Sequence, residues 1–309
     1  MVPPAYAYSG KGLYVYDISN LAIPVQVASS FNLGAEGYDI AIHGTGAYII
    51  TSDQTAELKV IDITNPSSPL IRAAYDTPGN GTGRVLTYVQ NGPLDGDVIY
   101  IGGTTGTVDA VLFQDTTSSF QRLASVAGLG GAVTGINLNN AFAYVSVNAI
   151  GQQLQVLDVF DPQSELLLTF TYNGLSGVSG GAAVVSTNTG LVLGRRQDLS
   201  ANSYEVNLIQ IGDSLGPSQP TWVDGFDVTG DVRSVGVTVD GRYAFIGSNN
   251  ATGQIRVVDM AKFSQGNQGL ASIVNTYNAG EAIGTTFYDA SKNRLFATSD
   301  TSLYIFAPG

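Results

Sequence analysis

The sequence predicts an all-β protein, a β-propeller of four-stranded antiparallel blades. A block of the form apolar-x-Val-x-Asp recurs along the chain as Leu58–Asp62, Leu154–Asp158 and Ile255–Asp259. Repeats with a period of about 45–50 residues are typical of propeller arrays, in which each repeat is one small sheet. Short β-branched and aromatic runs lie between the blocks, separated by Gly, Pro, Asn and Ser, and no helical periodicity is sustained.

The repeat that begins at Tyr38 shows its four strands most clearly, and we call them a to d from the inner to the outer strand. We expect strand a at 39–43, strand b at 47–51, strand c at 58–63 and strand d at 70–75. β-branched and aromatic residues favour each run as a strand, and turn residues end it. Strand c is expected near 13–18, 58–63, 108–113, 154–159, 205–211, 255–259 and 303–306.

The two ends of the chain decide the number of blades. Residues 5–18 and 294–306 each predict a hairpin of strands b and c, which gives seven such hairpins but only six strands a and six strands d. The sequence therefore favours seven blades in a single domain over 1–309, with strand a absent from the first blade and strand d from the last. A six-bladed ring is the alternative, in which 25–31 is the outer strand of the last blade.

An Asp ends strand c in four of the repeats, immediately before a turn. A carboxylate at this position can accept hydrogen bonds from backbone N–H groups and so fix the turn. We therefore predict a structural role for these residues, which are Asp17, Asp62, Asp158 and Asp259.

These blocks resemble the LVIVD-repeat family of β-propellers. The resemblance is carried by Leu58–Pro69 with the following Tyr75–Gly79, and by Leu13–Asn20, while the repeats near 108–113 and 205–211 lack the Asp-x-x-Asn-Pro tail. The resemblance implies a propeller in a secreted or cell-surface protein of bacteria or archaea. It implies no catalytic motif, so no site residue follows from it.

Composition excludes several classes of partner. The net charge is −12, only 12% of the 309 residues are charged, and no basic cluster is present to neutralise phosphates, so we expect no nucleic-acid partner. There is no Cys, which excludes disulfides and thiol chemistry. No apolar run is long enough for a spanning helix, so we expect no direct membrane insertion. The first residues, Met1–Ala5, lack the features of a signal peptide, and this Met need not be the native start.

Residues able to carry chemistry are few. His43, the single histidine, is interpreted as a polar turn residue rather than as a base or metal ligand. Arg195–Arg196 is interpreted as a solvated strand edge. Two pairs of carboxylates, Asp95 with Asp97 and Asp224 with Asp227, are the best local candidates for Ca²⁺, although neither fits an EF-hand loop. We predict no catalytic residue, no cofactor and no metal site, with Ca²⁺ as the single exception left open.

Two positions match the acceptor pattern for N-linked glycosylation. They are Asn80, in Asn80–Thr82, and Asn250, in Asn250–Thr252, and both lie in expected loops.

The function predicted from these observations is that of a non-catalytic binding or assembly module, extracellular or at the cell surface or envelope. Its partner is a protein or glycan on a loop face, or another copy that meets an open blade edge. One alternative is a subunit of an extracellular filament completed by strand exchange. The other is a hydrolase or lyase, which the expected strands a disfavour because only the neighbouring Asp39, Arg84 and Arg233 are ionisable.

Overall fold

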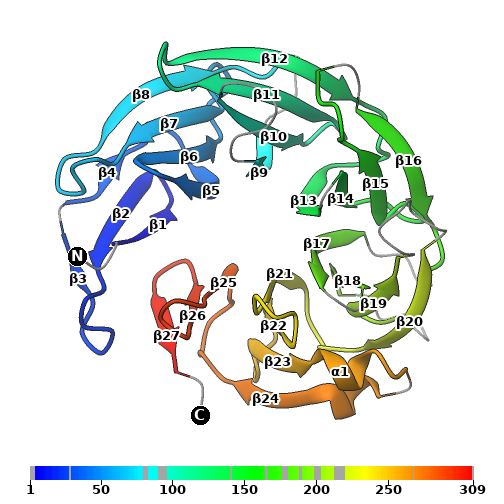
Figure 1. Ribbon diagram of the computed structural model, residues 1–309. Helices are drawn as coiled ribbons and strands as arrows, with labels where there is room; N and C mark the ends of the chain where they lie inside the picture. The colour runs from blue at the N-terminus through cyan, green and yellow to red at the C-terminus, as the bar shows by residue number, and fades with distance from the viewer. Residues whose placement is uncertain are drawn as a thin grey trace. The chain divides into compact units, whose positions relative to one another are not determined.

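The computed structural model confirms an all-β protein with seven separate sheets (Figure 1). It describes residues 4–27, 29–78, 83–89, 96–139, 141–163, 166–175, 180–187, 190–197, 203–211, 220–266 and 268–307. Packing divides the chain into two compact units, Met1–Gly128 with Asp161–Leu166, and Leu129–Phe160 with Leu167–Gly309. That residues 1–309 form a single domain stays a prediction.

The first unit holds three sheets. In the first, β1 (Ala5–Ser9) pairs with β2 (Gly12–Asp17), which pairs on its other side with the short strands β3 (Val25–Gln26) and β4 (Phe31–Asn32). The second sheet consists, in spatial order, of β5 (Gly37–His43), β6 (Gly46–Thr51), β7 (Leu58–Asp62) and β8 (Leu70–Tyr75). The third consists of β9 (Gly83–Val89), β10 (Asp97–Gly103), β11 (Val108–Gln114) and β12 (Ser119–Val126).

The second unit holds the other four sheets. The fourth sheet consists of β13 (Val133–Asn139), β14 (Phe142–Val147), β15 (Leu154–Asp158) and β16 (Leu167–Tyr172). The fifth consists of β17 (Gly181–Thr187), β18 (Gly190–Arg195), β19 (Val206–Gln210) and β20 (Thr221–Phe226). The sixth consists of β21 (Val232–Val237), β22 (Tyr243–Ser248), β23 (Ile255–Asp259) and β24 (Ile273–Tyr277), and the seventh of β25 (Thr285–Asp289), β26 (Arg294–Thr298) and β27 (Leu303–Phe306).

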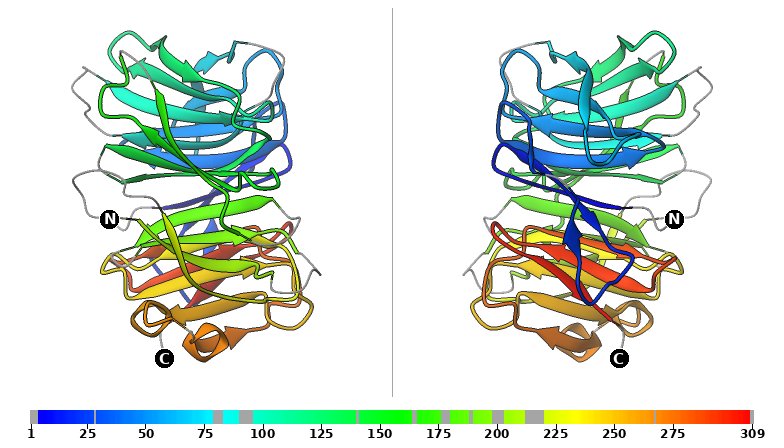
Figure 2. Two further views of the ribbon diagram at one scale, coloured as in Figure 1. Left: turned by 90° about the vertical axis from the view of Figure 1, so that its right-hand side faces the viewer. Right: turned by 90° about the vertical axis from the view of Figure 1, so that its left-hand side faces the viewer.

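The segment that joins β23 to β24 carries the helices of the described residues. These are α1 (Met260–Phe263) and a 3-10 helix (Gly269–Ser272), which pack against each other beside the sixth sheet (Figure 2). The side chain of Asp259 caps α1 by accepting hydrogen bonds from the N–H groups of Ala261 and Lys262.

Each of the five complete sheets, the second to the sixth, is antiparallel and follows the chain order a, b, c, d, as the sequence predicts. In the second sheet Leu58 lies opposite Tyr75, and the register shifts by one residue between Val60 and Ile61. The same shift between strands c and d occurs in the other four complete sheets. The outer strand therefore carries a bulge in each complete blade.

The first and last sheets show that the blade number is seven. β3 and β4 pair with β2, so residues 25–31 form the outer strand of the first blade. The six-bladed alternative, which assigns this segment to the last blade, is therefore wrong. In the described residues the first sheet contains strands b, c and d, and the seventh contains strands a, b and c. This is the arrangement that the hairpin count predicts.

The core lies between neighbouring sheets of each unit. Strands b and c are the most apolar in sequence and the most buried: all of β10 and β18 is buried, and so are the first four residues of β7 and β15. Leu58 and Val60, for example, pack against Ile99 and Ile101 of the next sheet. Within each unit, a blade thus covers one face of the blade that follows it in the chain.

A recurring set of polar contacts, which we call the connector clasp, joins neighbouring blades. A buried Glu or Gln precedes strand c and accepts the N–H of a connector residue that follows strand d of the same blade. The connector N–H to oxygen distances are 2.9 Å for Thr77 to Glu57, 3.1 Å for Val228 to Glu205 and 2.8 Å for Ala279 to Gln254. Backbone groups that strand pairing leaves unmatched are satisfied in this way.

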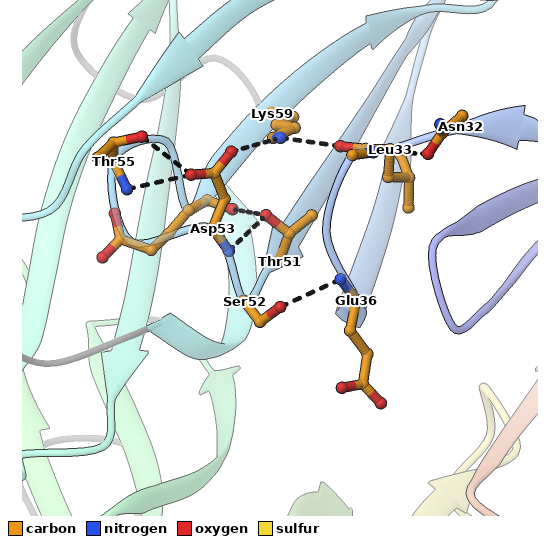
Figure 3. Close-up of polar contacts among 10 residues, drawn as sticks. Asn32, Leu33, Glu36, Thr51, Ser52, Asp53, Thr55 and Lys59 are labelled. Carbon is orange, nitrogen blue, oxygen red and sulfur yellow. Dashed lines mark hydrogen bonds and ion pairs between the residues drawn. The ribbon is translucent and has the colours of Figure 1, made fainter.

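The second half of the clasp comes from the next blade. The side chain of the second residue of its strand c donates a hydrogen bond to the connector carbonyl. The distance is 2.8 Å from Lys59 Nζ to the carbonyl oxygen of Leu33, and 3.3 Å from Arg256 Nη2 to that of Val228. Figure 3 shows that Lys59 Nζ also reaches Oδ2 of Asp53, at 2.9 Å. Lys59 is only 6% exposed, so this ammonium is buried but fully engaged.

Candidate functional site

Strand β27 is the outermost strand of the seventh sheet in the described part of the chain (Figure 1). Its four residues, Leu303 to Phe306, are all apolar or aromatic and all half-buried. The corresponding strands β7, β15 and β19, which have an outer strand beside them, are buried over their first four residues, while β23, which lines the cavity described next, has two half-buried residues there. β27 therefore presents a sheet edge together with incompletely buried apolar side chains.

A cavity of about 640 Å³ lies beside β27, between the sixth and seventh sheets. The sixth sheet contributes strands b, c and d and the turn between β21 and β22 to its wall, and the seventh contributes residues of β25, β26 and β27 and the turn between β25 and β26. Its apolar and aromatic lining includes Tyr243, Phe245, Val257, Tyr277, Tyr288 and Phe306. Ring pairs run along the wall, with 5.6 Å between the centroids of Phe245 and Tyr288 and 4.9 Å between those of Tyr277 and Phe306.

Polar groups at the rim of the cavity are engaged with one another. Oδ1 of Asp240 accepts hydrogen bonds from Thr238 Oγ1, at 2.5 Å, and from the N–H of Arg242, at 3.1 Å. These bonds, the first above all, hold the pKa of Asp240 below its usual range. The Arg242 guanidinium lies 5.1 Å from the ring centroid of Tyr243. The rim is thus polar and the interior apolar, which suits a peptide segment with one large apolar side chain.

Tyr304 fixes β27 to the connector before it. Its hydroxyl donates to the carbonyl of Ala279, at 2.9 Å, and to Oε1 of Glu281, at 2.7 Å. The bond from Tyr304, with those from nearby Ser and Thr hydroxyls, lowers the pKa of Glu281 to about 2. The position of β27 is therefore defined although its outer side is open.

His43 joins two neighbouring blades of the first unit. Its Nδ1 lies 2.8 Å from Oδ2 of Asp97, and the same oxygen accepts the hydroxyl of Tyr48 at 2.5 Å. Burial, and then the hydrogen bond to Asp97, raises the pKa of Tyr48. The sequence indicates a turn residue at His43 but gives no sign of this contact, because Asp97 lies 54 residues away.

The ionisable residues of the inner strands do not gather into one site. Asp39 Oδ2 accepts the N–H of Leu86 from the next inner strand at 2.9 Å, and Oδ1 accepts that of Ile40. Burial raises the pKa of Asp39 to about 6, although these hydrogen bonds oppose the shift. Arg84 lies over the ring of Tyr38, 4.2 Å from its centroid, and Arg233 is exposed on β21.

The proposed Ca²⁺ pairs are used in other ways where the structure describes them. Asp224 Oδ2 accepts the N–H groups of Gln268 and Gly269, both at 2.8 Å, and Asp227 accepts that of Thr229. Asp95 lies outside the described residues. Within the described ranges no three His, Cys, Asp or Glu side chains come close enough to hold a metal ion.

Arg195 corrects one prediction. It lies at the end of β18 with 0% exposure, and its Nη1 donates to Ser203 Oγ at 3.3 Å, so it is not part of a solvated edge. Only the adjacent Arg196 is exposed. Two consecutive Arg residues in the sequence do not show which of them is buried and which is exposed, because successive strand residues point to opposite faces of the sheet.

Of the two asparagines that match the glycosylation pattern, the structure describes only Asn250. Asn80 lies outside the described residues. Asn250 is 8% exposed, and its Nδ2 donates to the carbonyls of Val228, at 2.6 Å, and Thr229, at 3.2 Å. A glycan on Nδ2 would have to be added before these bonds form, and glycosylation at both positions stays a prediction.

The predicted role of the recurring Asp is confirmed. Oδ1 of each accepts the N–H two residues further on, at distances between 2.8 and 3.0 Å, in the pairs Asp17 with Ser19, Asp62 with Thr64, Asp158 with Phe160 and Asp259 with Ala261. The bond from the Ser19 N–H holds the pKa of Asp17 below its usual range, and hydrogen bonds from the side chain and then the backbone of Thr64 do the same for the pKa of Asp62.

The fold defines the class of the protein, a seven-bladed β-propeller. A chain of the mitotic checkpoint complex is similar in structure with a TM-score of 0.70 and 10% identity, over 98% of this chain and 83% of that one. A chain of hydrazine synthase from Kuenenia stuttgartiensis is similar with a TM-score of 0.72 and 11% identity, over 96% of this chain and 90% of that one. At these identities the likeness shows the fold alone.

The repeats identify the chain more closely. The family model described as LVIVD repeat matches residues 5–30 and 36–77, which cover the first two blades. The first two blades of this seven-bladed propeller are therefore LVIVD repeats, as the sequence blocks indicate. No curated protein matches the sequence. Among the described residues no helix has the length and apolar character needed to cross a membrane.

Proposed function

We propose that this propeller is a non-catalytic binding or assembly module that acts through the open edge of its last blade. The observation that carries the proposal is β27, whose residues Leu303 to Phe306 remain half-buried at a sheet edge. An extended segment added there gains main-chain hydrogen bonds and buries apolar side chains at the same time. Each fully buried large apolar side chain contributes about 1.5–3 kcal/mol.

The module acts outside the cell, at the surface or envelope. The support for this location is the resemblance of the repeats to a family of secreted and surface propellers and the small share of charged residues, 12%. Its partner is an extended protein segment rather than a glycan, because the open feature is a strand edge and not a polar pocket.

Assembly into a filament is the second candidate. The specific observation is that the first and last sheets are incomplete in different ways, with strand a missing from one and strand d from the other in the described residues. Contacts between two different surfaces of one protein are head-to-tail, and they build open polymers when the rotation does not close. Deleting residues 1–18 should then abolish the polymer and leave a folded particle.

The edge is tested by blocking it. Ile305→Lys places a charge on β27, which disfavours strand pairing at an edge. Ile71→Lys, on the exposed outer strand β8, is the matched control. Electron microscopy and sedimentation of the protein from its native source should show assemblies that Ile305→Lys removes and Ile71→Lys keeps, with unchanged circular dichroism. The proposal would be refuted if the protein is a monomer that co-purifies with no partner, or if its assemblies persist in the Ile305→Lys variant.

A further inference from the structure

The cavity beside β27 has a filled counterpart in the first unit, between the second and third sheets. The strand registers make the two places equivalent. Tyr48 lies opposite Val60 as Phe245 lies opposite Val257, and Leu58 lies opposite Tyr75 as Ile255 lies opposite Tyr277. The sixth sheet therefore offers the seventh the same kind of wall that the second sheet offers the third.

Two phenylalanines occupy the counterpart. Phe113, from the end of strand c, lies 5.9 Å from Tyr48, centroid to centroid and edge on. Phe120, from strand d, lies 5.3 Å from Tyr75 and 4.9 Å from Phe113. These ring contacts close the space between the two blades.

In the last blade other strands supply the rings that meet these walls: Tyr288 of β25 lies 5.6 Å from Phe245 and Phe306 of β27 lies 4.9 Å from Tyr277, centroid to centroid. Among the described residues no ring comes from a strand d. By register Phe306 takes the place of Val111, and the position of Phe113 corresponds to Pro308 in the sequence. The position of Phe120 belongs to a strand d, and β27 has none in the described residues. The 640 Å³ cavity lies beside this edge and is lined by Phe245 and Tyr277, the residues that correspond by register to Tyr48 and Tyr75.

We infer that the occupant of this edge is an extended segment of a second polypeptide that pairs antiparallel to β27 and places an aromatic side chain in the cavity near its N-terminal end. This inference rests on the proposed function and states what the partner must carry. The orientation follows from all five complete blades, in which strand d runs antiparallel to strand c.

The outer strands of the chain also define the other end of the segment. The residue opposite the first residue of strand c is large and apolar in every complete blade, as in Leu154 with Tyr172 and Val206 with Phe226. In the third blade this residue is Val126, six positions after Phe120. The partner therefore carries an aromatic residue and, six residues later, a large apolar residue opposite Leu303, with a bulge between them.

A labelled peptide with the sequence of residues 118–127 tests this inference, since it contains both features. It should bind the full chain saturably and protect the amides of Leu303 to Phe306 from hydrogen exchange. The peptide with Phe120→Ala should bind at least about tenfold more weakly, as expected when a central aromatic anchor is lost. Ala307→Trp, which places a large side chain in the cavity from its wall, should weaken binding of the unchanged peptide by a similar factor. Ala271→Trp, at an exposed position away from the cavity, is the control and should leave binding unchanged.

The outcomes separate the inference from the proposed function. No saturable binding up to about 1 mM, or equal affinity for the Phe120→Ala peptide, overturns the inference even where assemblies still depend on Ile305. Binding that survives Ala307→Trp also overturns it, because the ring then lies elsewhere. Peptide binding by a protein that forms no assembly in its native source supports the inference and refutes the proposed function.

Discussion

Asp53→Asn should destabilise the protein, because it leaves the buried Lys59 ammonium without its carboxylate. Lys59 Nζ lies 2.9 Å from Asp53 Oδ2, and the two side chains are 7% and 28% exposed. A fully buried pair that loses one member costs about 3–5 kcal/mol, whereas an exposed pair contributes about 0–1 kcal/mol. The pair is buried at Lys59 and partly exposed at Asp53, so we expect a loss of about 1–3 kcal/mol in the free energy of unfolding.

The effect should depend on pH in one direction. The hydrogen bond from Lys59, with that from Thr55, holds the pKa of Asp53 below its usual range. A carboxyl group with a lowered folded-state pKa stabilises the fold above its unfolded-state pKa, about 3.9, and loses this contribution as the pH falls through the folded-state value. The difference between wild type and Asp53→Asn should be complete at pH 7 and shrink below about pH 4.

Urea unfolding at several pH values measures both effects. Glu36→Gln is the control, since Glu36 is an exposed carboxylate in the same cluster and should change stability by less than about 0.5 kcal/mol (Figure 3). The double variant Asp53→Asn with Lys59→Met should recover part of the loss, because it removes the buried charge. A loss below about 0.5 kcal/mol at pH 7, or one that does not change with pH, would refute this reasoning.

Substitutions at three further positions test other contacts. Glu57→Ala should lower the free energy of unfolding by about 1–3 kcal/mol, because it leaves the buried N–H of Thr77 without an acceptor. Glu57→Gln should be tolerated, since Gln254 makes the same contact in the sixth blade. Burial raises the pKa of Glu57, so the stability of Glu57→Gln relative to wild type should increase as the pH rises, and a larger increase in acid would contradict this. Asp97→Ala should cost about 1–3 kcal/mol because the Tyr48 hydroxyl loses its acceptor, and an unchanged melting temperature would show that the contact is not formed. Asn250→Ala should cost a similar amount, about 1–3 kcal/mol, in protein made without glycosylation, and a neutral result would mean that its two carbonyl contacts contribute nothing.

Much of the fold could be predicted because repeats average out local ambiguity. The seven hairpins, the incomplete first and last blades and the turn role of Asp17 and Asp62 all follow from patterns that recur at fixed spacing. The third and fifth blades lack the tail of the block, yet their strands β11 and β19 lie where the period places them.

The connector clasp and the cavity did not follow from the sequence for different reasons. The clasp has a signal, a Glu or Gln directly before strand c at Glu57, Glu205 and Gln254, which alignment of the repeats would have shown. The residue that completes it varies from Lys59 to Arg256 to Tyr304, so no single residue type marks it. The cavity depends on which side chains fill the space between two sheets. The sequence does not show that Phe113 and Phe120 contact each other there, because this contact is a property of the folded chain.

The connector clasp bears on how the molecule comes apart. Val228 and Ala279 each have their N–H held by one blade and their carbonyl held by the next, so neither blade unfolds without exposing a polar group that its neighbour has buried. Such nearest-neighbour terms make a linear array of repeats unfold cooperatively. The link to the last blade uses the neutral hydroxyl of Tyr304 and that to the fourth blade the neutral amide of Gln155, whereas those to the second and sixth blades use Lys59 and Arg256. Hydrogen bonds from charged donors are about twice as strong, and in the described residues the seventh blade is also the end of the array. Unravelling should therefore start at the seventh blade, where a bound segment would act as a lock on the whole array.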